Sequence, residues 1–242
     1  MTDEPIPNRH RQKLRPAEPQ DLNFEMDTNF LPDDFMIGDV RVRERRHVIF
    51  ATANMLRLLK KAKSWYADST FKVVNKPFSQ LFSIHAFIRQ GDNSKQVPLL
   101  FCLMSGRKKR DYQGVLNHIR NLLQETSVKT VIIDFEAAMW KAFPTVFPDV
   151  EVRGCCFHWT QSVWRKIQDL GLAVSYKAHK DTYKYLRQLM SLPYLPKEHI
   201  TPLFDKLREK ATSPVLVQLV DYIDATWIRG AIWQPASWSV FN

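Results

Sequence analysis

The amino-acid sequence predicts an α/β fold: a mixed sheet of three antiparallel strands followed by parallel strands, with flanking helices and a C-terminal helical extension or insertion. Three observations predict it. Between residues 64 and 104, three segments rich in Phe, Val, Ile and Leu are separated by the turn signals NKP and GDNS. Short apolar runs then alternate with helical patterns up to about residue 170. Beyond Gly171, helical patterns separated by prolines follow.

The composition is that of an ordinary folded protein. The chain has 242 residues, of which 45% are hydrophobic and 25% are charged, so it can bury a substantial core. Its net charge is +10, from 35 Lys and Arg against 25 Asp and Glu. This charge favours a polyanionic partner such as nucleic acid, although a solvated basic surface without a specific partner would also produce it.

The cysteines and the hydropathy pattern indicate an intracellular location. The three cysteines, Cys102, Cys155 and Cys156, cannot form a closed disulfide framework and fit a reducing compartment. The first residues are polar, unlike a signal peptide, and no run approaches the ~20 apolar residues of a membrane span. We therefore expect a protein that is neither secreted nor bound in a membrane.

Residues 1–47 are predicted to be a largely irregular basic arm or linker. Isolated phenylalanines lie among Pro, Asp, Asn and charged residues without a clear period. The arm carries two basic clusters that either contact phosphates or direct nuclear import, or else are simply solvated. The first cluster consists of Arg9, His10, Arg11, Lys13 and Arg15, and the second of Arg41, Arg43, Arg45 and Arg46.

Residues 48–170 are predicted to form the core domain, preceded by a helix. Apolar residues at helical spacing predict that helix from Val48 to about Ala62. The three antiparallel strands follow, and then a helix from about Tyr112 to Leu123. TVIID and VEVRGCCF predict two further strands, and EAAMWKAFPTVF and HWTQSVWRKIQDL the helices that follow them. Residues 171–242 are predicted to be the helical extension or insertion.

This order of strands and helices is the RNase H topology, in which right-handed crossovers add parallel strands beside the first strand. An acid that ends the first strand can then meet an acid that ends the first parallel strand. Asp68 and Asp134 occupy these two places. Two carboxylates at such a position can hold Mg²⁺ or Mn²⁺ for phosphodiester chemistry. Alternatively, Asp68 caps a turn and Asp134 caps the next helix.

Two further groups of residues are candidate functional sites. Cys156 and His158 form a Cys-x-His pair, but the four ligands of a zinc site are not found at suitable spacing, so zinc is not expected. Cys156 also fits a small core position at a strand end, with His158 starting a helix. The basic turn of Arg107, Lys108, Lys109 and Arg110 is a candidate contact for a DNA backbone.

Four segments resemble consecutive blocks of the Mutator-like element (MULE) transposase domain in order and spacing. They are WYADSTFKVVNKPFSQLFSIHAF, VPLLFCLMSGRKKRDYQGVL, VIIDFEAAMWKAFPTVFP and GCCFHWTQSVWRKI. With flanking segments, the resemblance extends over about 200 residues, far more than a single motif. It implies an RNase H-like DDE transposase that cleaves DNA and transfers strands at a two-metal site of Mg²⁺ or Mn²⁺. Asp68 matches the first acid, Asp134 the second, and Cys156 and His158 the family's Cys-x-His signature, whose role stays open.

The resemblance also implies a departure from the family. The third acid, a glutamate, is expected in a helix after a block similar to residues 238–242, and no residue of this chain matches it. We therefore expect a C-terminally truncated fragment with an incomplete metal site. The resemblance implies DNA as the partner, allows a homo-oligomer, and places the protein in the nucleus, or in the cytoplasm before import. The alternative is a catalytically inactive, domesticated remnant that binds DNA or protein.

Overall fold

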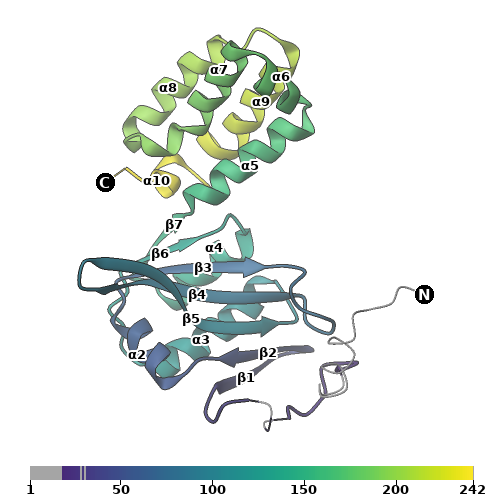
Figure 1. Ribbon diagram of the computed structural model, residues 1–242, viewed down its shortest axis with the longest axis vertical. Coiled ribbons are helices and arrows are strands. Elements are labelled where there is room, and N and C mark those ends of the chain that lie inside the picture. Colours follow the sequence, from purple (N-terminus) through teal and green to yellow (C-terminus); the bar gives the residue numbers. More distant parts are fainter. Residues whose placement is uncertain (1–17, 28, 30, 242) are drawn as a thin grey trace.

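The computed structural model describes residues 18–27, 29 and 31–241. The first basic cluster, from Arg9 to Arg15, lies outside these residues. Figure 1 shows two regions along the long axis. One is an α/β region built on a single sheet, and the other is a group of helices at one end of it. No helix within the described ranges is long and apolar enough to cross a membrane.

The described residues form one seven-stranded mixed sheet with the order β1-β2-β5-β4-β3-β6-β7. The central strands β3, β4 and β5 pair antiparallel, whereas β6 pairs parallel to β3 and β7 pairs parallel to β6. This is the predicted RNase H-like arrangement, with β1 and β2 added at one edge. The strands are β1 (Met36–Val42), β2 (Arg45–Phe50), β3 (Ser64–Thr70), β4 (Gln80–Gln90), β5 (Asn93–Met104), β6 (Thr130–Ile133) and β7 (Glu151–Gly154).

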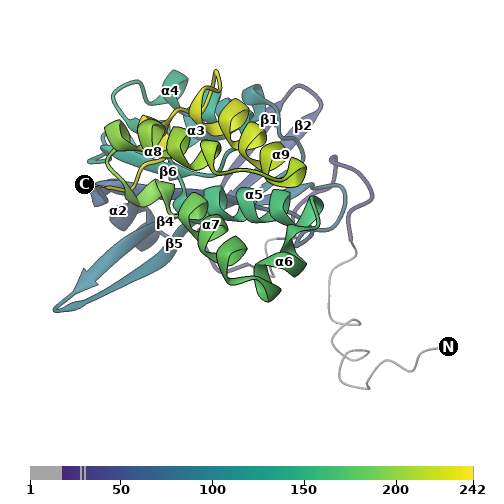
Figure 2. The ribbon, with the colours of Figure 1, turned by 90° about the horizontal axis from the view of Figure 1, so that it is seen from above.

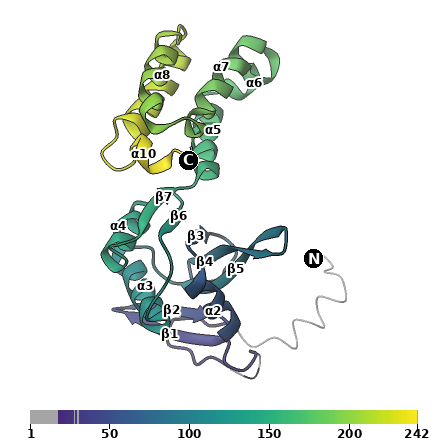
Figure 3. The same ribbon diagram turned by 90° about the vertical axis from the view of Figure 1, so that its left-hand side faces the viewer.

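Helices α3 (Lys109–Leu123) and α4 (Ala137–Val146) pack together on one face of the sheet (Figure 3). The buried residues Trp65 and Ala67 of β3 and Val131 and Ile133 of β6 belong to the same core as these helices. Because side chains alternate along a strand, the residues between them turn to the opposite face. Helix α2 (Ala53–Lys61) lies where β3 begins, and Trp65 Nε1 donates a hydrogen bond to the carbonyl of Leu59 (3.0 Å).

The helices after β7 form a second core, seen from above in Figure 2. Helix α5 (Cys156–Asp169) belongs to this second core, because its buried residues Trp159, Val163 and Ile167 pack among the later helices. The remaining helices are α6 (Leu172–Ala178), α7 (Lys180–Met190), α8 (Lys197–Glu209), α9 (Pro214–Ile223) and α10 (Pro235–Trp238), with a 3-10 turn at Leu192–Tyr194 and a π turn at Asp224–Ile228.

The structure differs from the sequence prediction between residues 36 and 52. The predicted helix from Val48 was wrong at its start, because Val48, Ile49 and Phe50 lie in β2 and α2 begins at Ala53 after its N-cap Thr52. Strands β1 and β2 form a hairpin that begins within the expected irregular arm of residues 1–47 and extends past it to Phe50. Arginines lie between its apolar residues, so the sequence of the hairpin resembles a basic cluster and not the regular alternation of a strand.

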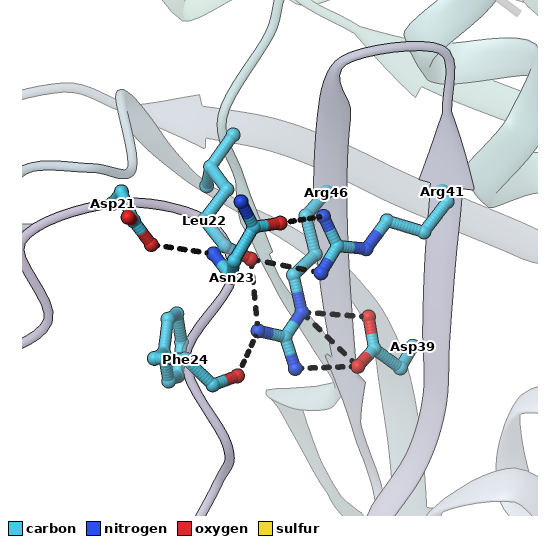
Figure 4. A network of polar contacts seen from close by, with 7 residues as sticks. All are labelled: Asp21, Leu22, Asn23, Phe24, Asp39, Arg41 and Arg46. Carbon is cyan, nitrogen blue, oxygen red and sulfur yellow. Dashed lines mark hydrogen bonds and ion pairs between the residues drawn. The ribbon is translucent and has the colours of Figure 1, made fainter.

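Two arginines of that cluster hold the N-terminal segment against the hairpin (Figure 4). Arg46 is 4% exposed and pairs with Asp39 (2.6 Å). It also donates hydrogen bonds to the carbonyls of Leu22 (3.1 Å) and Phe24 (2.5 Å). Arg41 donates to the same Leu22 carbonyl (2.9 Å). The Arg46 guanidinium is therefore part of an internal network rather than an exposed phosphate contact.

Candidate functional site

The parallel register of β3 and β6 places Asp68 and Asp134 side by side. Ala67 pairs with Ile133, and one acid follows each of these residues. Ala67 and Ile133 are buried toward the helices, so the next side chain on each strand points away from that core. The carboxylate of Asp68 is partly exposed, whereas that of Asp134 is more deeply buried.

The pKa of Asp134 depends on burial and on the charges of its neighbours. Burial raises the pKa of Asp134, the nearby His158 opposes this rise, and the negative charge of Asp68 adds to it. The pKa is raised because burial and a like charge both disfavour the ionised carboxylate. A cation at this position would relieve both effects.

His158 lies beside the two acids from the first turn of α5. Its Nε2 atom is 3.7 Å from Asp68 Oδ1. The polar contact with the Cys155 thiol raises the pKa of His158, burial opposes the rise, and the charges of Asp68 and Asp134 add to it. The imidazole therefore interacts with both predicted acids.

The cysteine that accompanies His158 is Cys155, whereas the sequence pattern paired His158 with Cys156. Burial of the Cys155 thiol disfavours its ionisation, but the contact with His158 and backbone donors outweigh burial, so the pKa of Cys155 is lowered. Cys156 instead lies beside the hydroxyl of Tyr194, whose pKa it raises. Successive residues at the start of a helix point in different directions, so the Cys-x-His pair does not meet as a unit.

A third carboxylate, Glu136, was missed by the sequence reasoning. It follows Asp134 by two residues, and its Oε2 atom accepts a hydrogen bond from the Tyr112 hydroxyl (2.9 Å). Burial raises the pKa of Glu136; the Tyr112 bond opposes this, Asp134 adds to it and Arg107 opposes it. The sequence did contain a signal for Glu136, because a second acid follows Asp134 by two residues in the motif D-F-E. Tyr112 gave no separate signal, because it fits the apolar face of a helix.

The capping roles considered for the two aspartates are present only in part. Asp68 Oδ1 accepts from the backbone N–H of Ser69 (2.9 Å), and Asp134 Oδ1 accepts from that of Glu136 (3.3 Å). The residue at the N-cap of α4 is Glu136 rather than Asp134. These local bonds involve one oxygen of each carboxylate.

The basic turn divides into residues near the acids and residues away from them. The guanidinium of Arg107 lies 5.0 Å from the centre of the Phe71 ring and opposes the rise in the pKa of Glu136, so it lies on the acid side. Lys108 and Lys109 are exposed at the start of α3, whereas Arg110 is partly buried. Of the four, Arg107 is the residue that the structure brings to the acids.

Two hollows adjoin the acids, and His158 lines both. The first, with a volume of about 260 Å³, lies on the sheet and is lined by Tyr66, Asp68, His85 and Cys155 among others. The second, about 340 Å³, we call the arginine groove. Its lining residues are Phe71, Arg107, Asp134, Phe135, Glu136, His158, Gln161, Ser162 and Arg165.

The donor chemistry of the pair fits a hard divalent cation. Carboxylate oxygens are the ligands that Mg²⁺ and Mn²⁺ prefer, and the pKa of Asp134 is raised mainly by burial, with a further contribution from the charge of Asp68. Over residues 18–27, 29 and 31–241, no group of three or more His, Cys, Asp and Glu side chains is arranged to hold a metal ion. The chemistry of the two carboxylates is therefore compatible with such a cation, and the two are the only candidate ligands that the sequence pattern indicates for it.

Comparison with known proteins identifies the segment that carries these residues. Residues 64–162 match the family described as the MULE transposase domain. The matched segment starts at β3, ends within α5 and includes Asp68, Asp134, Cys156 and His158. A comparison with curated proteins finds no match to this chain.

Proposed function

Since residues 64–162 match the MULE transposase domain, we propose that this chain acts in DNA transposition by metal-dependent cleavage and strand transfer of phosphodiesters. The observation that carries the proposal is the in-register placement of Asp68 and Asp134 after β3 and β6, where each acid lies close to the other and to His158. The net charge of +10 suits a DNA partner. Such a role places the protein with chromosomal DNA, in the nucleus.

In this proposal Asp68 and Asp134 hold Mg²⁺ or Mn²⁺. When bound, such a cation supplies charge stabilisation to the attacking and leaving oxygens of a phosphodiester. His158 acts as a positioning residue, because its Nε2 atom lies 3.7 Å from Asp68 Oδ1 and can fix the orientation of that carboxylate. The Tyr112 hydroxyl donates a hydrogen bond to Glu136 and can fix the orientation of this carboxylate, two residues after Asp134.

The proposal is tested by replacing each acid with its neutral isostere. Asp68→Asn and Asp134→Asn should each weaken Mn²⁺ binding and reduce Mn²⁺-dependent nicking of supercoiled DNA by on the order of 100-fold or more, because a direct ligand is lost. Binding is measured by the electron paramagnetic resonance signal of free Mn²⁺. The matched control is Asp92→Asn, in the exposed turn between β4 and β5.

His158→Asn separates positioning from folding. We expect nicking to fall by about 10- to 100-fold, as for other residues that orient a metal ligand, while thermal unfolding stays close to that of the parent protein. Nicking and Mn²⁺ binding that are unchanged in both aspartate variants would refute the metal site.

A second candidate function is DNA binding without cleavage. The observation that favours it is the lack of a three-ligand metal cluster among the described residues, together with the basic surface that includes Arg107, Lys108 and Lys109. It predicts DNA binding that weakens steeply with salt and no nicking at any Mg²⁺ or Mn²⁺ concentration. Nicking that depends on Asp68 and Asp134 would exclude it.

A further inference from the structure

The arginine groove combines an exposed aromatic ring, two arginines and small polar side chains next to Asp134. Phe71 is 41% exposed although it is a large apolar residue. It follows the end of β3, three residues after Asp68. Arg107 and Arg165 are also exposed, and both line the groove with Phe71. These three residues come from the β3–β4 connection, the turn before α3, and α5.

Phe71 and Arg107 form a stacked pair rather than two separate side chains. The guanidinium carbon of Arg107 lies 5.0 Å from the centre of the Phe71 ring, within the range of a cation–π interaction. Aromatic rings and guanidinium planes are the surfaces on which unpaired nucleobases stack in proteins. The Phe71 ring therefore offers an exposed apolar surface at the groove.

The charges around the groove indicate where the phosphates of such a ligand would lie. Arg165 is in the middle of α5 and Arg107 is in the turn before α3, and both line the groove together with Asp134 and Glu136. Two exposed arginines match the phosphates on either side of one nucleotide. Gln161 and Ser162 offer amide and hydroxyl groups for the edge of a base.

We propose that the arginine groove binds one unpaired nucleotide of the DNA strand, with its base stacked on the Phe71–Arg107 pair and its phosphates near Arg107 and Arg165. The inference rests on the proposed function for the identity of the polymer, DNA. It goes further in requiring a base that is not paired. The groove has a volume of about 340 Å³, which is in the range of pockets that bind a ligand of about the size of one nucleotide.

The test compares three DNA duplexes of identical sequence by fluorescence anisotropy, in EDTA at low salt. One is blunt, one carries two unpaired adenines at a 3′ end, and one carries two abasic sugars there. We expect the adenine extension to strengthen binding roughly 10-fold over the blunt duplex, as one stacked base does. We expect the abasic extension to give no such gain.

Variants of Phe71 test whether the stronger binding of the adenine-extended duplex depends on the groove. Phe71→Ala should remove the gain, and Phe71→Trp should keep it, because a larger ring stacks equally well. The control Tyr183→Ala removes an aromatic ring of similar exposure, 43%, on α7, and should keep the gain. Since Phe71 is exposed, its loss should leave the fold intact, as thermal unfolding will verify.

Three results would overturn the inference: equal affinity of the parent protein for the blunt and adenine-extended duplexes, an equal gain from abasic sugars, or a gain that persists in Phe71→Ala. The assay contains no metal and requires no cleavage. A protein that fails to nick DNA but shows the Phe71-dependent gain would refute the proposed function alone, and the converse pattern would refute this inference alone.

Discussion

Tyr112 has two roles at the residue scale, because its ring packs in the buried core and its hydroxyl joins a chain of hydrogen bonds that ends at Glu136. Gln80 Nε2 donates to the hydroxyl (2.9 Å), and the hydroxyl donates to Glu136 (2.9 Å). Ser69, the neighbour of Asp68, lies 3.3 Å from the same hydroxyl. One buried side chain thus links the strand of the first acid to the helix after the second.

We predict that Tyr112→Phe lowers the free energy of unfolding by about 1–3 kcal/mol, because buried polar groups of Gln80 and Glu136 lose their partner. Urea unfolding followed by circular dichroism measures the change. Tyr183→Phe, which removes an exposed hydroxyl, should change stability by less than about 0.5 kcal/mol. Equal effects of the two variants would show that the hydrogen-bond chain contributes nothing.

His47 makes stability depend on pH. It is fully buried on β2, and burial lowers its pKa below the ordinary value of 6.5; Asp111 opposes this and Arg45 adds to it. The unfolded chain therefore binds a proton more readily than the folded protein. By linkage, the contribution of neutral His47 is fully present above pH 6.5 and is lost as the pH falls toward the lower folded pKa.

We predict that the unfolding free energy of the parent protein falls more steeply below pH 6.5 than that of His47→Gln. The comparison is needed because Asp134 and Glu136 have raised pKa values and change stability in the opposite direction. Urea titrations at several pH values measure the two slopes. Parallel curves for the two proteins would contradict the assignment to His47.

At the element scale, β7 ends at a glycine that a larger residue cannot replace without movement. A Cβ atom at Gly154 would lie 2.5 Å from the Phe135 ring. Phe135 stands between Asp134 and Glu136 and packs against Trp140 and Trp227. The close approach of β7 to this ring is therefore part of what positions the acids.

We predict that Gly154→Ala destabilises the protein by about 1–3 kcal/mol, the cost of overpacking a filled site. Gly91→Ala is the control, because its added methyl group meets no atom within 4 Å and its cost is limited to the strain of a φ of +60°, about 1–2 kcal/mol. Differential scanning calorimetry of both variants measures the difference. A Gly154→Ala protein as stable as the parent would mean that Phe135 moves freely.

The sequence predicts most elements, because apolar runs bounded by turn signals set the strands β3 to β7 and helical spacing sets α3, α4 and α5. It predicts the meeting of Asp68 and Asp134 as well, since topology alone brings their strands together. The β1–β2 hairpin was missed because arginines interrupt its apolar pattern. The spacing of Trp159, Val163 and Ile167 shows that α5 has an apolar face but cannot show which of two cores receives it.

The rest of the site depends on packing between distant elements. Glu136 meets Tyr112 because α3 lies against α4, and no local pattern encodes that contact. Likewise, Arg107 meets Phe71 because two connections happen to lie side by side in the fold. The sequence shows which residues have suitable chemistry, whereas the assembled structure shows which of them meet.

At the scale of the whole molecule, two cores share a small aromatic junction. Phe135, in the loop before α4, contacts Trp227 (4.5 Å between ring centres) and Trp233 (5.6 Å) of the helical region. Covalently, the sheet and the helices are joined through β7 and α5 (Figure 1). Phe135 therefore contributes aromatic contacts between the two cores.

We predict that Phe135→Ala loosens the helical region more than the sheet. Loss of a buried Phe side chain costs about 3–5 kcal/mol, and Phe135 is half-buried, so the lower end applies. Hydrogen exchange followed by mass spectrometry should show faster exchange in α5 to α9 than in the parent protein, with β3 to β5 unchanged. Uniformly faster exchange in both regions would show that they unfold as one unit.

His158 lies on the first turn of α5, so the acids are next to the end of this helix that adjoins the sheet. The 14 residues of α5 extend about 21 Å from the sheet, and the other helices pack along them. A tilt of the helical region about the first turn of α5 would move its far end in proportion to this length and would leave His158 close to Asp68. The register of the two carboxylates, set by the pairing of β3 with β6, therefore does not depend on where the outer helices lie.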